Sequence, residues 1–352
     1  VTAQRRTENV QDVPVAISTL DNEKLNILGS GGDDIRLLSG RVPSLLIESS
    51  FGRAFPRFYI RGLGNTDFDL NASQPVSLIY DDVVQENPIL KGFPVFDLEM
   101  VEVFRGPQGT LFGRNTPAGV VKFNSVRPSR EMGGYFQASY GEDATVNLEG
   151  AVGGPLGKNW SMRLSAMYQH RDDWVDNYEP DGDLIEKNAF EGYDEAAGRL
   201  QFLYEPSEDF SALINIHART LDGTARMFRA NVFELGSQGL VSGFDEDVVS
   251  YDGSNDQDLD SSGGSLRISK NFGNVTLHTI TGYETVDVLS RGDIDGGYSC
   301  AFAPCTAPSG PGFIPFTAES ADGLSDHDQL TQEIRLESRE LGAFDWQAGV
   351  YH

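Results

Sequence analysis

The chain has 352 residues, 39 of them glycine, and a formal net charge of −26. Hydrophobic residues make up 39% and aromatic residues 10%, a composition typical of a folded chain and not of a disordered one. Such an acidic balance argues against non-specific nucleic-acid binding, which requires basic patches that face phosphate. It contains no run of about 18 apolar residues, so no transmembrane helix is expected, and no signal peptide is visible.

Residues 1–130 are predicted to form a mixed α/β domain. A short strand is expected at 13–19, one or two helical turns at 20–26, and a short helix within 33–43, where Gly and Pro end the pattern. Further strands are expected in runs bounded by Gly and Pro: 57–64, 75–85, 100–106 and 119–126.

Residues 131–352 follow a different pattern, in which apolar and polar side chains alternate with a period of two. In 160–169, for example, Trp160 and Tyr168 share an apolar face, and Ser161 and Arg163 lie on the opposite, polar face. Nine strands are predicted: 132–140, 144–153, 159–170, 193–205, 209–220, 262–271, 274–288, 328–339 and 344–352.

The connections between these strands alternate in length. Short turns alternate with long acidic segments at 171–192, 221–261 and 289–327, and only the first connection departs from this order. Short turns at one end and long loops at the other are typical of an outer-membrane barrel, and a soluble sandwich has no reason to sort its loops in this way. Because nine is an odd strand number and the pattern stops inside a strand, we expect the N-terminal part of a longer protein.

Five segments resemble one family, the TonB-dependent outer-membrane receptors of the iron-complex branch. "VEVFRGPQGTLFGRNTPAGVVKF" (101–123) is similar to the end of their plug domain, and "FYIRGLG" (58–64) and "PVSLIYDDV" (75–83) are similar to earlier plug strands. "TQEIRLES" and "WQAGVY" resemble early strands of their barrel.

This resemblance implies an α+β plug domain (1–130) followed by antiparallel transmembrane β-barrel strands (131–352), the first part of a barrel of about 22 strands. It places the protein in the outer membrane of a Gram-negative bacterium, among lipid and lipopolysaccharide. It also implies TonB, with its inner-membrane complex, as the energising partner. Val1, Thr2 and Ala3 would be the remnant of the TonB-binding segment.

Two plug arginines, Arg61 and Arg105, match family positions that pair with glutamates on the barrel wall. A buried guanidinium needs such partners, although both arginines could instead be exposed charges at strand ends. The motif glycines would allow tight turns and a close approach to the wall. They are Gly62, Gly106, Gly109, Gly113 and Gly119.

The matching loop tips of the plug are candidates for ligand contact, although any one of them could equally be a solvated tip that touches nothing. The candidates are Asn65, Asp67, Phe68, Asp69, Gln85 and Asn87. The expected ligand, a ferric siderophore, follows from the branch of the family and not from any residue. The alternatives are the same barrel importing a carbohydrate or another nutrient, and a soluble β-rich binding or adhesion module.

No enzyme, cofactor or metal centre is predicted. The five histidines are scattered, "GSGGDD" (29–34) lacks the Lys of a phosphate loop, and "DQDLDSSGG" (256–264) matches only the start of a calcium loop. No Ser-His-Asp or paired-carboxylate motif stands out. Cys300 and Cys305 are too far apart for a C-x-x-C motif, and a loop disulfide is expected, with two free thiols as the alternative.

Overall fold

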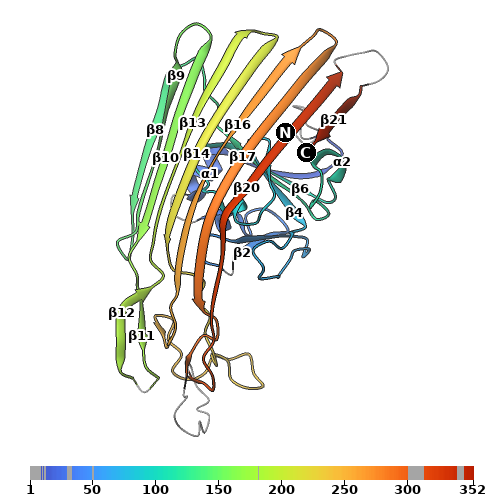
Figure 1. Cartoon of the computed structure of the whole chain (residues 1–352). Coiled ribbons are helices and arrows are strands. Elements are labelled where there is room, and N and C mark those ends of the chain that lie inside the picture. Colours follow the sequence, from blue (N-terminus) through green and yellow to red (C-terminus); the bar gives the residue numbers. More distant parts are fainter. Residues whose placement is uncertain are drawn as a thin grey trace.

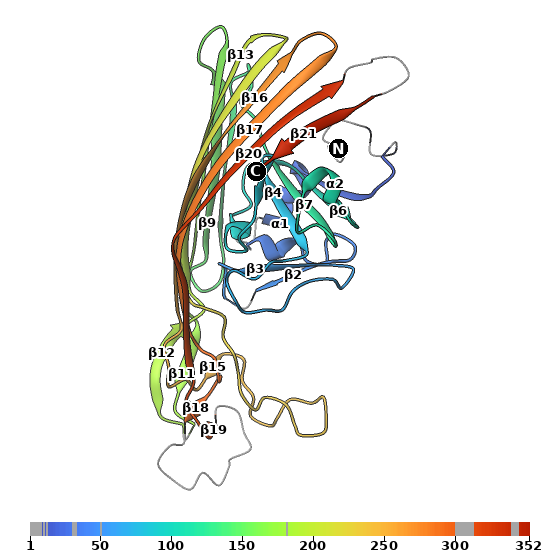
Figure 2. The ribbon, with the colours of Figure 1, turned by 45° about the vertical axis from the view of Figure 1, so that its right-hand side comes forward.

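The computed structural model describes residues 9, 11, 13–29, 34–49, 51–180, 182–299, 313–338 and 345–352. A curved sheet of long strands, called the wall below, partly surrounds a smaller α/β domain that lies on its concave side (Figures 1 and 2). None of the described helices is long and apolar enough to cross a membrane.

The wall contains nine antiparallel strands, as predicted, and each pairs with its neighbours along the chain. They are β8 (Gly133–Tyr140), β9 (Val146–Pro155), β10 (Trp160–Arg171), β13 (Tyr193–Ser207), β14 (Phe210–Gly223), β16 (Asp256–Asn271), β17 (Val275–Asp293), β20 (Glu319–Ser338) and β21 (Gln347–Tyr351). β16 and β20 begin six and nine residues before their predicted starts, because acidic residues that read as loop continue the strands.

The two faces of the wall invert the pattern of a soluble protein. On β14 the apolar Ile216 is 54% exposed, whereas Asn215 and Arg219 are 3% and 2% exposed. β10 repeats this arrangement, with Leu164 exposed on the convex side and Ser165 buried. A sheet that turns its apolar side chains outward and its polar side chains inward is suited to lipid outside and a polar lumen.

The two ends of the wall differ. Short turns join β9 to β10, β13 to β14 and β16 to β17 at one end, and the long connections leave from the other, called the loop end below (Figure 1). These long segments were predicted as loops, but they contain short strands that form two small sheets. The strands are β11 (Val175–Tyr178), β12 (Leu184–Phe190), β15 (Val248–Val249), β18 (Tyr298–Ser299) and β19 (Phe313–Ile314).

The N-terminal domain is built on a five-stranded sheet in the order β1-β6-β7-β4-β5, with a separate hairpin of β2 and β3. The elements are β1 (Ala16–Asp21), α1 (Asn22–Gly29), η1 (Ile35–Leu38), β2 (Leu45–Ser49), β3 (Pro56–Ile60), β4 (Val76–Tyr80), β5 (Val83–Gln85), η2 (Leu90–Gly92), β6 (Leu98–Arg105), α2 (Gly109–Phe112) and β7 (Gly119–Ser125). Each predicted run contains an element of the expected type, but 75–85, predicted as one strand, is the hairpin of β4 and β5. β2 and η2 were not predicted, and α2 gives the Gly-rich segment between β6 and β7 a helical turn.

The β4–β5 hairpin shows how the sequence shapes one tip of this domain. Its two-residue turn consists of Asp81 and Asp82, with φ values of 47° and 73°. A tight hairpin turn requires such left-handed residues, and Asp is among the few side chains that adopt this conformation readily. The turn therefore places two carboxylates side by side, where Ser125 donates to Asp81 and Lys122 to Asp82.

Two sequence predictions fall on residues outside those described. They are the TonB-binding remnant at Val1, Thr2 and Ala3, and the disulfide between Cys300 and Cys305. Both remain predictions.

Candidate functional site

The N-terminal domain contacts the wall first through Asp97, just before β6. Arg163 of the wall donates to both carboxylate oxygens of Asp97, at 2.8 Å and 2.5 Å, and the hydroxyl of Ser165 donates to one of them. Arg199, only 2% exposed, donates to the Asp97 carbonyl at 3.0 Å and to the Tyr80 hydroxyl at 2.6 Å. A buried carboxylate is stable here because two arginines compensate the cost of its desolvation.

The β4–β5 turn makes the second contact. Asn215 donates to the Asp81 carboxylate at 3.0 Å, and Arg267 forms an ion pair with Asp82. Lys122 of the same domain also reaches Asp82, at 2.8 Å. The two aspartates that the turn requires for its backbone thus also bind the domain to the wall.

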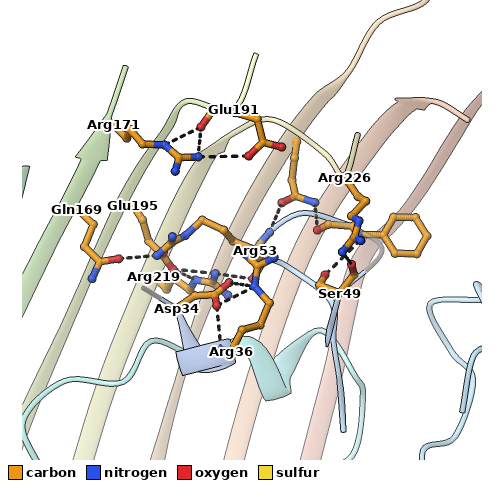
Figure 3. A network of polar contacts seen from close by, with 12 residues as sticks. Asp34, Arg36, Ser49, Arg53, Gln169, Arg171, Glu191, Glu195, Arg219 and Arg226 are labelled. Carbon is orange, nitrogen blue, oxygen red and sulfur yellow. Dashed lines mark hydrogen bonds and ion pairs between the residues drawn. The ribbon is translucent and has the colours of Figure 1, made fainter. Parts of the chain in front are cut away.

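The third contact has the opposite polarity and lies near the loop end. Arg53, between β2 and β3, pairs with Glu195 of β13 at 2.7 Å, and Glu195 also accepts from Arg219 of β14 at 2.8 Å (Figure 3). Burial would lower the pKa of Arg53, but Glu195 and Asp34 more than offset this and raise it. For Asp34, burial would raise the pKa, and Arg53 and Arg36 hold it below its ordinary value.

A glycine lets the Arg53 loop lie this close to the wall. A Cβ at Gly52 would lie 2.6 Å from the Thr224 carbonyl oxygen, and the residue has a φ of +55°. The Gln257 side chain fixes the loop from both sides, since it donates to the Phe51 carbonyl at 2.5 Å and accepts from the Arg53 amide at 3.2 Å.

Between this loop and the wall lies a cavity of about 470 Å³. Its charged lining comes from both parts of the molecule: η1 and the Arg53 loop on one side, and the loop ends of the wall strands on the other. The charged residues are Asp34, Arg36, Arg53, Arg171, Glu191 and Arg226. Figure 3 shows how their side chains gather around Arg53.

Comparisons with known proteins identify the N-terminal domain. Residues 9–120 match the profile of the TonB-dependent receptor plug domain. This match covers about a third of the chain. The domain on the concave side of the wall is therefore similar to that plug domain and is called the plug below.

Two curated relatives match part of the chain. The pesticin receptor of Yersinia pestis is 26% identical over 115 residues, which cover 33% of this chain and 17% of that protein. The ferrioxamine B receptor of Salmonella typhimurium is 36% identical over 77 residues, which cover 21% of this chain and 11% of that protein. The matched segments are thus a small part of either relative.

Solved structures match over nearly the whole chain. The ferric yersiniabactin uptake receptor of Yersinia pestis has a TM-score of 0.72 at 16% identity, over 96% of this chain and 48% of that one. The closed form of the ferric-catecholate import receptor of Escherichia coli has a TM-score of 0.71 at 18% identity, over 97% and 47%. These matches establish the fold, and this chain spans about half the length of those receptors.

Arg61 and Arg105, predicted to pair with wall glutamates, lie away from the three contacts with the wall. Arg61 is exposed and Arg105 is half-buried, with its Nε unpaired. Across the described part of the chain, neither arginine forms an ion pair. Their pairing with the barrel remains a prediction, and the described wall binds the plug through a different set of charges.

The motif glycines fall into two groups. Gly62, Gly106, Gly113 and Gly119 have positive φ values, and a Cβ at Gly119 would lie 2.1 Å from the Phe104 carbonyl oxygen. Gly109 has neither feature: its nearest neighbour would be the Thr116 hydroxyl, at 3.7 Å. The close approach at Gly119 is to the neighbouring plug strand and not to the wall.

The predicted ligand contacts also divide. Asp67, Phe68 and Asp69 are exposed and Asn65 is half-buried, whereas Gln85 and Asn87 are 5% and 6% exposed. Gln85 donates to Glu284 of the wall at 3.4 Å, and the Asn87 side chain accepts from the Ile89 amide at 2.9 Å. In this conformation the loop that contains residues 65–69 is open to a ligand. The side chains of Gln85 and Asn87 instead form hydrogen bonds within the protein.

Phe68 connects the exposed plug loop to a long connection of the wall. Its ring centroid lies 6.2 Å from that of Phe51 and 6.4 Å from that of Phe228, and its ring covers the Arg57 guanidinium at 4.7 Å. The tip is therefore held by aromatic contacts.

Sequence analysis missed the residues that connect the plug to the wall, above all Arg53, Asp97 and Glu195. One signal was available for Arg53, which is a charged residue inside the apolar run "SFGRAF". Asp97 looks like an ordinary loop residue, and Glu195 lies on a polar face where any polar side chain would be expected. Within the described ranges, no group of three or more His, Cys, Asp or Glu side chains is placed to hold a metal ion.

Proposed function

We propose that this chain is part of a TonB-energised importer that carries a ferric siderophore across the outer membrane of a Gram-negative bacterium. The observation that carries the proposal is the plug bound on the lumen side of the wall. A ligand larger than water could not diffuse past a domain anchored by buried ion pairs, so import needs energy to move the plug.

Complementary charges on the plug and the wall explain how the plug stays in place. Asp97, Asp81 and Asp82 meet arginine or amide side chains of the wall, and Arg53 meets Glu195. Apolar contacts accompany these pairs near the loop end, where Phe55 and Leu70 of the plug pack in one cluster with wall residues such as Leu221 and Val288. The proposed pulling by TonB must overcome this interface, at least in part.

The ligand would enter from the loop end. Both the exposed loop with Phe68 and the arginine-rich cavity open on this side, and the long connections extend beyond them (Figure 2). The surrounding partners would be outer-membrane lipid against the convex apolar face, lipopolysaccharide around the loop end, and TonB on the opposite side. No catalytic role is proposed, in keeping with relatives that are receptors.

The test is growth of a strain that lacks the complete gene. Wild-type and deletion strains are compared under iron limitation and under limitation of other nutrients, with ferric siderophores added one at a time. A defect confined to iron limitation, relieved in the wild type alone by one ferric siderophore, supports the proposal. A defect that follows a carbohydrate or another nutrient instead would leave the architecture in place and refute the ligand class.

A further inference from the structure

The charged lining of the cavity beside Arg53 has the opposite sign to the net charge of the chain. The protein as a whole carries a net charge of −26, yet the charged lining of the cavity consists of four arginines and two carboxylates. Glu195 lies behind Arg53 and is shared with Arg219, so this carboxylate and the fifth arginine add no net charge to the region. Because a guanidinium does not lose its proton in proteins, the positive excess is present at every physiological pH.

Some of these guanidinium groups are held rigidly in position. The guanidinium carbons of Arg53 and Arg171 lie 4.0 Å and 5.1 Å from the centroid of the Tyr193 ring. Glu191 accepts from Arg171 through its backbone carbonyl, at 2.9 Å from Nε, and through its side chain, at 3.3 Å from Nη2. Two like charges close to one ring are costly unless carboxylates, or an anion, lie beside them.

Other donors at the cavity have few partners. Among the described residues, Arg226 is exposed and uses one N–H group, which donates to the Ser49 carbonyl at 2.7 Å. The Arg36 side chain is 37% exposed and reaches Asp34 through Nε at 2.9 Å. Each guanidinium carries five N–H donors in a planar fork that matches a pair of oxygens, so both arginines can still bind an anion in two-point fashion.

We propose that this cavity is a binding subsite for an anionic, oxygen-rich part of the imported ligand, so that the receptor selects ferric chelates with carboxylate or catecholate charge over uncharged ones. The inference rests on the proposed function and specifies the ligand class. An acidic outer surface would otherwise repel such chelates, and a local positive cavity at the loop end overcomes that repulsion at short range.

The test compares two ferric chelates of similar size, a trianionic tris-catecholate and an uncharged trihydroxamate, on the purified full-length receptor. Arg36→Gln combined with Arg226→Gln removes two charges and leaves the buried Arg53–Glu195–Arg219 ion pairs in place, so the fold should persist. Arg130→Gln is the matched control, because Arg130 is exposed at the short-turn end, where its Nη2 donates to the Glu205 carbonyl at 3.0 Å.

For the anionic chelate, the double variant is expected to raise Kd by roughly tenfold or more, the loss expected for charge-assisted hydrogen bonds. The uncharged chelate and the control variant should change by less than about twofold. If the wild type binds both chelates equally well and the double variant leaves both Kd values unchanged, the subsite is refuted and the proposed import function stands. If no ferric chelate of either charge binds the wild type, the proposed function itself fails.

Discussion

Asp97 of the plug and Arg163 of the wall form a two-point ion pair, with distances of 2.8 Å and 2.5 Å between the guanidinium nitrogens and the carboxylate oxygens. The Asp97 side chain is fully buried and that of Arg163 is 13% exposed. The pair joins residues 66 positions apart in the chain and connects the plug to β10. It therefore offers the most direct way to loosen the plug without changing the barrel.

Asp97→Asn is expected to weaken the plug–wall interface by about 3 to 5 kcal/mol, because Arg163 and Arg199 would remain buried without their carboxylate. Cells that carry the variant should become more sensitive to large antibiotics, and the plug should be cleaved by protease at lower urea concentrations. Glu99 lies two residues after Asp97 and is exposed. Glu99→Gln removes the same charge as Asp97→Asn and serves as the control. Equal behaviour of the two variants would show that the ion pair does not anchor the plug.

Asp82→Asn distinguishes the role of Asp82 in the β4–β5 turn from its role in the contact with the wall. Asn tolerates the left-handed conformation, so the β4–β5 hairpin should survive, while the charge that faces Arg267 is lost. A double-mutant cycle with Arg267→Gln, measured by urea-dependent protease cleavage of the plug, should give a coupling energy above about 1 kcal/mol. Additive effects of the two substitutions would mean that this ion pair contributes nothing to docking.

The plug glycines should differ sharply in their tolerance of alanine. Gly119→Ala places a Cβ 2.1 Å from a backbone oxygen of β6 and should abolish accumulation of folded receptor. Gly109→Ala meets no atom closer than 3.7 Å and should change stability by less than about 1 kcal/mol. Both are measured as heat-modifiable receptor in outer-membrane fractions. Loss of the receptor in both variants, or in neither, would contradict the role assigned to the approach at Gly119.

From the burial of Lys91 we predict that the stability of the plug depends on pH. The Lys91 ammonium group is 1% exposed and donates to the Val76 carbonyl at 3.0 Å, and burial lowers its pKa from 10.5 to about 8. Because the folded pKa lies below the unfolded one, the unfolded state binds more protons between these values. The stability of the plug should therefore rise as pH increases from about 8 to 10.5.

Lys91→Met should remove this dependence and stabilise the plug at pH 7 by up to about 3 kcal/mol. Hydrogen exchange of the β4 amides, corrected for intrinsic rates, reports the effect. The advantage of the variant should shrink near pH 10, and Lys24→Met, whose lysine side chain is 59% exposed, should show no such trend. An advantage that does not vary with pH would indicate that the pKa of Lys91 is the same in the folded and unfolded states.

The sequence predicted the local features of this molecule well. The wall strands were recognisable because lipid and lumen impose opposite polarities on successive side chains, as Ile216 and Asn215 illustrate. The glycine motif at 101–123 was recognisable because its backbone turns need residues such as Gly113, with a φ of +77°. In both cases the signal lies within a few residues of the feature that it predicts.

The contacts between the plug and the wall could not be predicted in the same way. Arg53 and Glu195 are 142 positions apart, and Asp82 and Arg267 are 185 apart, so no local pattern relates them. The cavity beside Arg53 is built from both parts of the chain and has no sequence signature of its own. The strands within the long connections were missed because they are short, as is β15, or contain acidic residues, as does β11.

The central claim is energised import of a ferric siderophore, and uptake of radioactive iron tests it most directly. Cells with the complete gene and cells without it are given labelled ferric siderophores, with the proton gradient intact or collapsed. The account predicts uptake of at least one of them that requires both the gene and the gradient. Uptake that is the same without the gene, or that continues after the gradient is collapsed, would contradict it.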